Sequence, residues 1–516
     1  MQDSSKEMLL EKNDKKKYKI SFLSFVGMIF ITVYGLQNGQ QIYYQMGYAA
    51  ITYVIIAAIL YFIPYSFIVA EMSSAFKHKS GGIFSWMSET VGKGFGLIGT
   101  FIWYGSFVVL WFSATVITVN VSVAIFGKDT TSTWHIGHLF NSPETIAIIG
   151  AIYMIVVAFL STRGLKRMTF LSNISIISVI ISHILMLGGG LLVFAMSGFK
   201  FAQGFNFHKT QSYFYGPNPH YASLLPAIAF MVFTIFVFAG MENSAGLVDK
   251  VENAKKNVPK AIILSSAIIT ILYIVIIIIT GMVCNWNKTF GGDQVNLGNY
   301  SIYIIQQQFY RLGSLLGLSI NTSIQLGMWV NRILNILTLI GLAGMPLRIY
   351  SPIKHTIEGL PKGVLPEKIT RSNKFGMPSI AILIQTIIVV GFILLLGFGG
   401  SSVSSLFNKI TLMSFVAGSV PISFIVFAYI KFKKNSSIPK EYEFFNKKWG
   451  IIVGTICFIA VTFTNIFSIL QPGLSGNWEN TFWVAMGPLL FGAIGLFLHL
   501  RYKHKIKKGI ISVEEK

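Results

Sequence analysis

One apolar stretch, residues 224–259, most constrains how this chain can fold, because it is long enough to cross a bilayer yet contains a carboxylate. Gly240 lies near its middle, and Glu242 follows two residues later. A carboxylate at that depth costs at least ~2.5 kcal/mol on insertion scales, so it should face the protein interior or a wet cavity. Glycine lets the backbone leave the helix, which hydrocarbon tolerates only where the exposed amides line a cavity. We therefore expect a broken helix that forms half of a mid-membrane binding site.

The composition of the whole chain is that of a membrane protein. Of its 516 residues, 53% are hydrophobic and only 12% are charged, about half the charged share of a typical soluble protein. The two cysteines, Cys284 and Cys457, lie in separate apolar runs, so neither a disulfide framework nor a metal site is expected. The N-terminus is polar through Lys19 and has no cleavable signal pattern. Because no P-loop, zinc-type spacing or nucleophile elbow occurs, we expect no cofactor, no ATP-driven transport and no catalysis.

The distribution of positive charge predicts the topology. With the N-terminus inside, 34 of the 41 Lys and Arg residues fall in inner segments and six in outer loops, and Arg332 lies within a span. The net charge of +22 is thus a topology signal rather than a nucleic-acid-binding surface. It predicts a multi-pass plasma-membrane protein with both termini in the cytoplasm and lysine runs that are attracted to anionic lipid. The twelve predicted transmembrane helices are roughly 20–46, 48–72, 95–126, 145–162, 168–198, 222–248, 260–284, 313–350, 378–398, 404–430, 450–470 and 481–500.

The first predicted span also has an interruption. Residues 31–41, ITVYGLQNGQQ, contain two glycines and four side-chain amides, and those polar groups need partners inside a membrane. Two broken spans that lie five spans apart are typical of an inverted repeat. The prediction is an all-α integral membrane protein with a ten-helix transport core at 20–430. Its repeats are 20–198 and 222–430, helices 11 and 12 follow at 450–500, and cytoplasmic tails lie at 1–19 and 501–516.

A succession of short motifs runs through spans one to ten. FIP at 62–64, AEM at 70–72 and GGIFSW at 81–86 are followed by FAGME at 238–242 and ENAKKNVPKA at 252–261; GMP at 344–346, LP at 365–366 and NKFGMP at 373–378 come later. In this order they resemble the amino acid–polyamine–organocation permease superfamily and, within it, the glutamate/GABA antiporter-like branch. The resemblance implies a LeuT-like fold, a 5+5 inverted repeat plus two further helices, that works by alternating access.

The resemblance also indicates where substrate would bind. In such permeases the backbone amides of a Gly-Ser-Gly at the first break hold the substrate carboxylate, and the equivalent residues here are Tyr34, Gly35 and Leu36. Only one of them is glycine, as in the antiporter-like branch, so the substrate's carboxylate and its being an α-amino acid stay open. The expected substrate-binding residues are Val33, Tyr34, Gly35, Leu36, Tyr104, Phe236, Phe238, Ala239, Gly240 and Glu242.

Each of these residues also has a purely structural interpretation. Glu242 either binds a substrate ammonium or takes a proton that gates the cycle, or it ties the break to a neighbouring helix by a hydrogen bond. Gly35 and Gly240 either break their helices or allow close helix packing. Tyr104, Phe236 and Phe238 either gate the site and stack on an ammonium group or simply pack in the core.

Three further polar residues in or near predicted spans have open roles. Several proton-coupled relatives carry a lysine on the fifth helix; here its position is Ile180, and His183 lies nearly one turn later. His183 is therefore a proton-coupling candidate, with a hydrogen-bonded core histidine as the alternative. Arg332 either pairs with a carboxylate, binds an acidic substrate or snorkels to the outer interface. Glu71 is expected to form a structural ion pair that closes an inner gate.

The function that these observations favour is secondary transport of a small amino acid or related amine, by antiport or proton symport. The alternative is a transport-inactive nutrient sensor or scaffold on the same fold. A sensor should carry an extra soluble domain, and only about 19 residues precede the first predicted span and 16 follow the last. A channel would need a continuous polar face along several helices, whereas here the polar residues cluster at two breaks.

Overall fold

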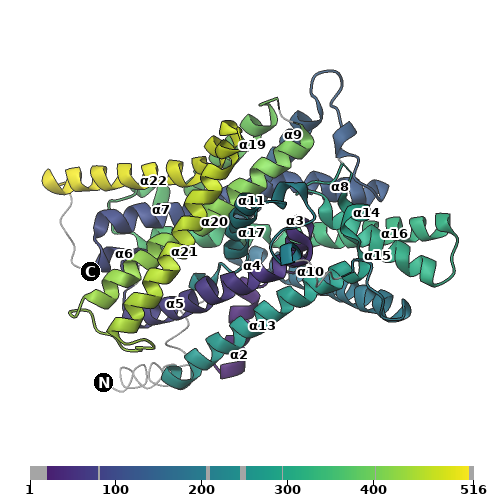
Figure 1. Cartoon of the computed structure of the whole chain (residues 1–516). Coiled ribbons are helices and arrows are strands. Elements are labelled where there is room, and N and C mark those ends of the chain that lie inside the picture. Colours follow the sequence, from purple (N-terminus) through teal and green to yellow (C-terminus); the bar gives the residue numbers. More distant parts are fainter. Residues whose placement is uncertain are drawn as a thin grey trace, which may run out of the picture.

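The structure, a computed structural model, describes residues 20–79, 82–204, 210–243, 251–292, 294–400 and 402–510. In these residues the regular structure is helical apart from two isolated β-bridges, Ile20 with Val251 and Ile136 with Phe140. The long helices pack side by side in one bundle (Figure 1). The all-α prediction is therefore confirmed for the described part of the chain. The predicted tail at 1–19 and the last six residues lie outside it.

The first half of the chain follows the predicted spans closely, with a break after α2 and short 3₁₀ or π turns that connect consecutive helices. The helices are α2 (Phe22–Val33), α3 (Leu36–Met46), α4 (Ala50–Ala57), α5 (Ile63–Ala75), α6 (Ile83–Thr90), α7 (Lys93–Leu110), α8 (Ile117–Phe126), α9 (Ser142–Ser161) and α10 (Leu165–Met196). The turns are η1 (Gly47–Ala49), η2 (Ala58–Phe62), η3 (Trp111–Val116), η4 (Thr131–Thr133), η5 (Thr210–Tyr213) and η6 (Pro219–Tyr221).

The second half contains two helices, α15 and α17, that the predicted spans do not give as separate elements. Its elements are α11 (Leu224–Ala229), α12 (Met231–Val237), α13 (Ala254–Val283), α14 (Trp286–Phe290), α15 (Tyr300–Leu315), α16 (Ile320–Gly341), η8 (Leu342–Gly344), α17 (Met345–Gly359), α18 (Glu367–Thr370), α19 (Ser379–Gly397), α20 (Val403–Lys434), α21 (Lys447–Leu474) and α22 (Trp478–Lys507). The last helix continues into the predicted C-terminal tail, where His504, Lys505 and Lys507 complement the helix dipole.

Eleven helical stretches among the described residues are long and apolar enough to cross a membrane, against twelve predicted spans. The difference lies at the first predicted span, which the break divides into α2 with 12 residues and α3 with 11. Each is shorter than the ~20 residues that a span needs, and α3 runs through η1 into one stretch, Gln37–Ala75. The eighth predicted span begins later than expected, at Ile320, after the turn that ends α15. The twelve-helix count and the LeuT-like repeat remain predictions.

Two features of the bundle position the residues described below. The turn η2 is a single π-helical turn just before Pro64, which has no N–H to donate to the carbonyl of residue 60. This turn and α5 direct Tyr61, Phe62 and Tyr65 into the core, where each is almost completely buried. The long helix α13 packs against α2, α3 and α5, and so passes beside the first break, which lies between α2 and α3 (Figure 1).

Candidate functional site

The first break lies where the sequence predicts it. Helix α2 ends at Val33, Tyr34 and Gly35 have extended backbone with ψ of 133° and 118°, and α3 begins at Leu36. The first amides of α3 have no carbonyl one turn earlier to bind, so they are available to an acceptor from elsewhere. The backbone of Leu36 is part of this break, while its side chain lies outside what the structure describes.

The second break is also present. Helix α12 ends at Val237, and the chain leaves the helix through Ala239 and Gly240 before a 3₁₀ turn at residues 241–243. Gly240 has φ of +120°, a conformation that L-residues other than glycine rarely adopt. Residues 244–250, which follow, are outside the described part of the chain.

The two breaks lie directly against each other. A Cβ atom on Gly240 would sit 2.6 Å from the carbonyl oxygen of Thr32 in the last turn of α2, so only glycine permits this approach. The hydroxyl of Tyr273, a fully buried residue of α13, joins them: it accepts a hydrogen bond from the Gly35 amide at 3.2 Å. The same hydroxyl donates to the carbonyl of Val237 at 3.0 Å, and the carbonyl of Val33 lies 3.4 Å away. One side chain therefore links both interrupted helices.

Glu242 points into the protein beside the second break. Its Oε2 accepts hydrogen bonds from the Tyr65 hydroxyl at 3.2 Å and from the Gly240 amide at 3.3 Å. No Lys, Arg or His of the described residues forms an ion pair with it. The carboxylate thus has polar partners but no cation, which is the arrangement expected of a group that binds an ammonium or a proton.

Two further donors lie next to this carboxylate. The indole N–H of Trp103, 7% exposed, makes a weak hydrogen bond to Glu242 that falls outside regular geometry. The hydroxyl of Tyr61, 1% exposed, interacts electrostatically with Glu242 and has no hydrogen-bond partner among the described residues. Buried polar groups are nearly always paired, and an unpaired one calls for an explanation such as a bound molecule. Carboxylate and donors together could hold both ends of a small polar solute.

Comparison with known proteins identifies the group to which a chain with two such breaks belongs. The sequence model of the family described as "Amino acid permease" matches residues 20–494. The chain belongs to the amino acid permease family. This permease is 34% identical to the inner membrane transporter YjeM of Escherichia coli over 95% of its own length and 98% of the relative's. It is 23% identical to the glutamate/gamma-aminobutyrate antiporter of Lactococcus lactis subsp. lactis over 98% and 93%. It is 21% identical to the aspartate/glutamate permease AcaP of Lactococcus lactis subsp. cremoris over 89% and 88%.

These matches and the eleven apolar helical stretches establish a multi-pass membrane transporter of this family. They support the predicted plasma-membrane location, since the first relative is an inner membrane transporter.

The permease places its two predicted phenylalanines differently. Phe238 is fully buried at the second break, stacked on Phe62 with ring centroids 4.6 Å apart and set edge-on to Tyr273. Phe236 packs against Phe415 of α20, 5.2 Å between centroids. Phe238 therefore supports the break from behind, whereas the half-buried Phe236 lies between α12 and α20.

The predicted Tyr104 is not brought to the breaks. Its hydroxyl donates to Gln385 of α19 at 2.6 Å, and its ring packs against Phe101 and Phe491. The preceding residue, Trp103, is the one that faces Glu242. Consecutive residues of a helix point about 100° apart, so the prediction chose the correct helix, α7, and the wrong face of it.

His183 lies at a small polar cavity rather than at the breaks. Its Nδ1 is 2.7 Å from the carbonyl oxygen of Val179 in its own helix, so Nδ1 donates a hydrogen bond to this carbonyl. The cavity has a volume of about 60 Å³, room for a few water molecules. The residues that line it are Gln37, Gln40, Asn120, Ser182, His183, Met186, Ser301, Ile305, Leu334, Asn335 and Thr338.

Arg332 forms no ion pair among the described residues; its guanidinium lies 4.5 Å from the ring centre of the exposed Trp329. It also lies near Gly127, at the end of α8. Neither contact leads to the breaks, which does not support a role for Arg332 in substrate binding at that place.

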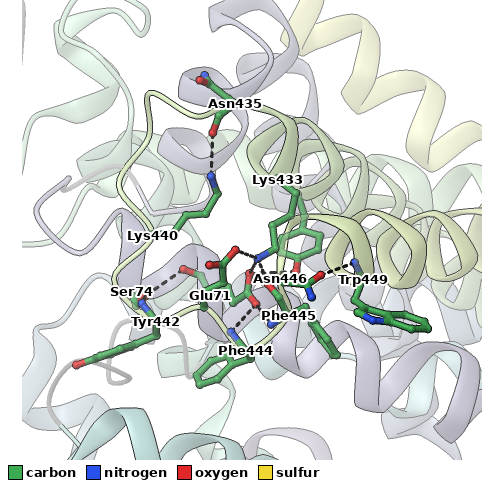
Figure 2. A network of polar contacts seen from close by, with 12 residues as sticks. Glu71, Ser74, Lys433, Asn435, Lys440, Tyr442, Phe444, Phe445, Asn446 and Trp449 are labelled. Carbon is green, nitrogen blue, oxygen red and sulfur yellow. Dashed lines mark hydrogen bonds and ion pairs between the residues drawn. The ribbon is translucent and has the colours of Figure 1, made fainter.

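Glu71 forms the predicted ion pair, and Figure 2 shows its surroundings. Lys433 of α20 lies 2.8 Å away, with both side chains at most 1% exposed. The amides of Phe444 and Phe445, in the loop between α20 and α21, each donate to Glu71 at 2.8 Å, and Tyr429 donates at 3.0 Å. Lys77 and Lys79, the nearest lysines in sequence, pair with Glu441 and Glu89 instead.

Sequence reasoning missed three residues of the site: Tyr65, Trp103 and Tyr273. Each has a polar tip on a large ring within an apolar span, and such a tip needs a partner once it is buried. Tyr273 was the most visible of them, because it interrupts a run of isoleucines at 268–279. What the sequence does not reveal is that the polar tips of these residues all lie at the two breaks, Tyr65 and Trp103 at Glu242 and Tyr273 between the broken helices.

Proposed function

We propose that this permease is a secondary active transporter that moves a small amino acid or related amine by alternating access. The observation that carries the proposal is the direct contact between the two broken helices beside the half-buried Glu242 carboxylate, which pairs with no cation among the described residues. Broken helices that meet near the middle of the membrane are where such transporters bind their substrates, because the free amides and carbonyls solvate polar groups there.

The two ends of the substrate would bind to different parts of this site. The first break, from Val33 at the end of α2 to Leu36 at the start of α3, offers backbone amides and the positive end of the α3 dipole to an anionic group. The end of α12, with Ala239, Gly240 and the carboxylate of Glu242, offers acceptors to an ammonium. Trp103 replaces Tyr104 as the residue of α7 that reaches the substrate, Phe236 borders the site toward α20, and Phe238 shapes it from behind.

Exchange is the mode that the comparisons favour, since one relative is named as an antiporter. Proton coupling would use Glu242, which has no cation partner among the described residues, or His183, which lines a cavity that can hold water. No metal or other cofactor is needed in this scheme.

Reconstitution into liposomes tests the proposal. Uptake of labelled L-glutamate, γ-aminobutyrate, L-leucine, L-arginine and putrescine should be measured with and without internal substrate and with and without a pH gradient. We expect uptake of at least one of them, and dependence on internal substrate would demonstrate exchange. Glu242→Gln should abolish uptake. Glu144→Gln is the matched control, because Glu144 belongs to the N-terminal capping box of α9. A wild-type protein that takes up none of the compounds would favour the sensor or scaffold alternative.

A further inference from the structure

The Tyr273 hydroxyl occupies two groups that the proposed substrate needs. It accepts from the Gly35 amide at the start of α3 and donates to the Val237 carbonyl at the end of α12. A carboxylate would accept from the first group, and an ammonium would donate to the second. A neutral hydroxyl can both accept and donate, so it satisfies both breaks at once.

We propose that the Tyr273 hydroxyl is a built-in substitute for the polar head of the substrate, and that substrate binding displaces it. This inference rests on the proposed function, since it assumes that substrate enters between the breaks. Without the hydroxyl, an empty site would leave two buried backbone groups unsatisfied, which is costly in a membrane interior. With it, the empty permease keeps its broken helices together.

The surroundings of Tyr273 allow such a displacement. The carbonyl of Val33, 3.4 Å from the hydroxyl, is an alternative acceptor within a small rotation of the ring. The ring itself is held by Tyr34 and Phe238, each 5.4 Å between centroids, so it can tilt without leaving the core. The donors of Tyr61 and Trp103 lie next to Glu242 at the second break and can donate to oxygen atoms of the incoming molecule.

The decisive variant is Tyr273→Phe, which removes the hydroxyl and keeps the ring. We expect the half-saturation concentration, for whichever of L-glutamate, γ-aminobutyrate, L-leucine and L-arginine the wild type transports, to fall about tenfold, equivalent to ~1.4 kcal/mol. The gain arises because the substrate now satisfies groups that the empty variant leaves unpaired. An unchanged or higher half-saturation concentration would overturn the proposal, because the hydroxyl would then be purely structural or would contact the bound substrate.

Tyr43→Phe is the matched control. Tyr43 is also fully buried, and its hydroxyl also donates to a backbone carbonyl, that of Cys284, at 2.9 Å. Both variants should lower the thermal unfolding midpoint in detergent, but only Tyr273→Phe should increase affinity. If affinity rises equally in both, the effect is a general loosening of the protein and the proposal fails.

A second measurement does not depend on the variant's folding. The full chain with 3-fluorotyrosine at position 273 should change its fluorine resonance when the transported amino acid is added, and 3-fluorotyrosine at position 43 should not. An unchanged resonance at position 273 would contradict displacement. If the wild type shows uptake but Tyr273→Phe does not gain affinity, or the fluorine resonance at position 273 does not change, only the role of Tyr273 is rejected. If the wild type shows no uptake, the proposed function is rejected as well.

Discussion

Two glutamates of this permease that point into the protein, the buried Glu71 and the half-buried Glu242, have opposite surroundings. Glu71 at the end of α5 is paired with Lys433 at 2.8 Å and accepts three further hydrogen bonds, two of them from backbone amides. Glu242 accepts two longer bonds, both on one oxygen, from Tyr65 and Gly240. The Tyr61 hydroxyl and the Trp103 indole lie beside it, and no cation pairs with it among the residues that the structure describes.

The difference separates a carboxylate that holds the fold together from one that is left to bind something. A fully paired buried charge has no capacity for a ligand, and removing one partner is far costlier than removing both. A carboxylate with few partners costs stability in the empty protein and recovers it when a cation arrives. Glu71 thus ties α5, α20 and the loop after α20 into one body (Figure 2), and Glu242 is the group available to the substrate.

Breaking the Glu71 pair should have the largest effect on stability. Lys433→Met leaves the carboxylate buried without its cation, and we expect a loss of about 3–5 kcal/mol in the free energy of unfolding. The measurement is thermal or chemical unfolding of the purified protein in detergent.

The double variant Glu71→Gln with Lys433→Met is the control for this loss. Gln keeps an acceptor for the amides of Phe444 and Phe445, and the double variant leaves no buried charge unpaired, because Glu443, the other partner of Lys433, is 41% exposed. The double variant should therefore recover most of the stability. A double variant as unstable as Lys433→Met alone would show that packing, not charge, holds this region.

Neutralising the other glutamate should give the reverse pattern. Glu242→Gln keeps the shape and an acceptor for Tyr65, so the free energy of unfolding should change by less than about 1 kcal/mol. Transport should nevertheless fall at least about tenfold, because the ammonium or proton loses its partner. Uptake and unfolding are measured on the same preparation. A stability loss as large as that of Lys433→Met would place Glu242 in the same structural class as Glu71.

The Gly240 amide, which donates a hydrogen bond to Glu242, can be displaced by substituting Gly240 itself. Gly240→Ala forces an L-residue to adopt φ of +120° and puts a methyl group against the Thr32 carbonyl, so we expect a cost of about 1–3 kcal/mol from backbone strain alone. At the other break, Gly35→Ala is the control: its φ is −136°, and the methyl would meet only the movable amide of Asn38. Unfolding in detergent should show a clear loss for the first and little for the second; equal losses would mean that the breaks are not in contact.

Local chemistry in the sequence was enough to predict the breaks and most of the helices. Gly35 and Gly240 weaken their helices by their own backbone freedom, and apolar runs of span length fix the long helices whatever surrounds them. Helix α15 was missed because its run, YSIYIIQQQFYRLGSL, mixes polar and apolar residues and does not resemble a span.

The composition of the site depends on packing, which a single sequence does not encode locally. The rotation of α7 decides whether Trp103 or Tyr104 faces Glu242, and that rotation is set by the helices around it. The ion pair of Glu71 was expected, but its partner Lys433 comes from the far end of the chain. Tyr273 could be recognised as a buried tyrosine that needs partners, but not as the link between the two breaks.

The smallest predicted effect compares the tyrosines that donate to the two glutamates. Tyr65→Phe removes one of the two hydrogen bonds of regular geometry that Glu242 accepts from the described residues, and a net loss of about 1 kcal/mol should reduce the uptake rate by roughly fivefold. Tyr429→Phe removes one of four partners of Glu71, which keeps its lysine and both amides, so uptake should stay within about twofold of the wild type. Initial uptake rates in liposomes measure both. If Tyr429→Phe slows transport as much as Tyr65→Phe does, the cluster around Glu71 takes part in the transport cycle, and the division between a structural and a substrate-binding glutamate no longer holds.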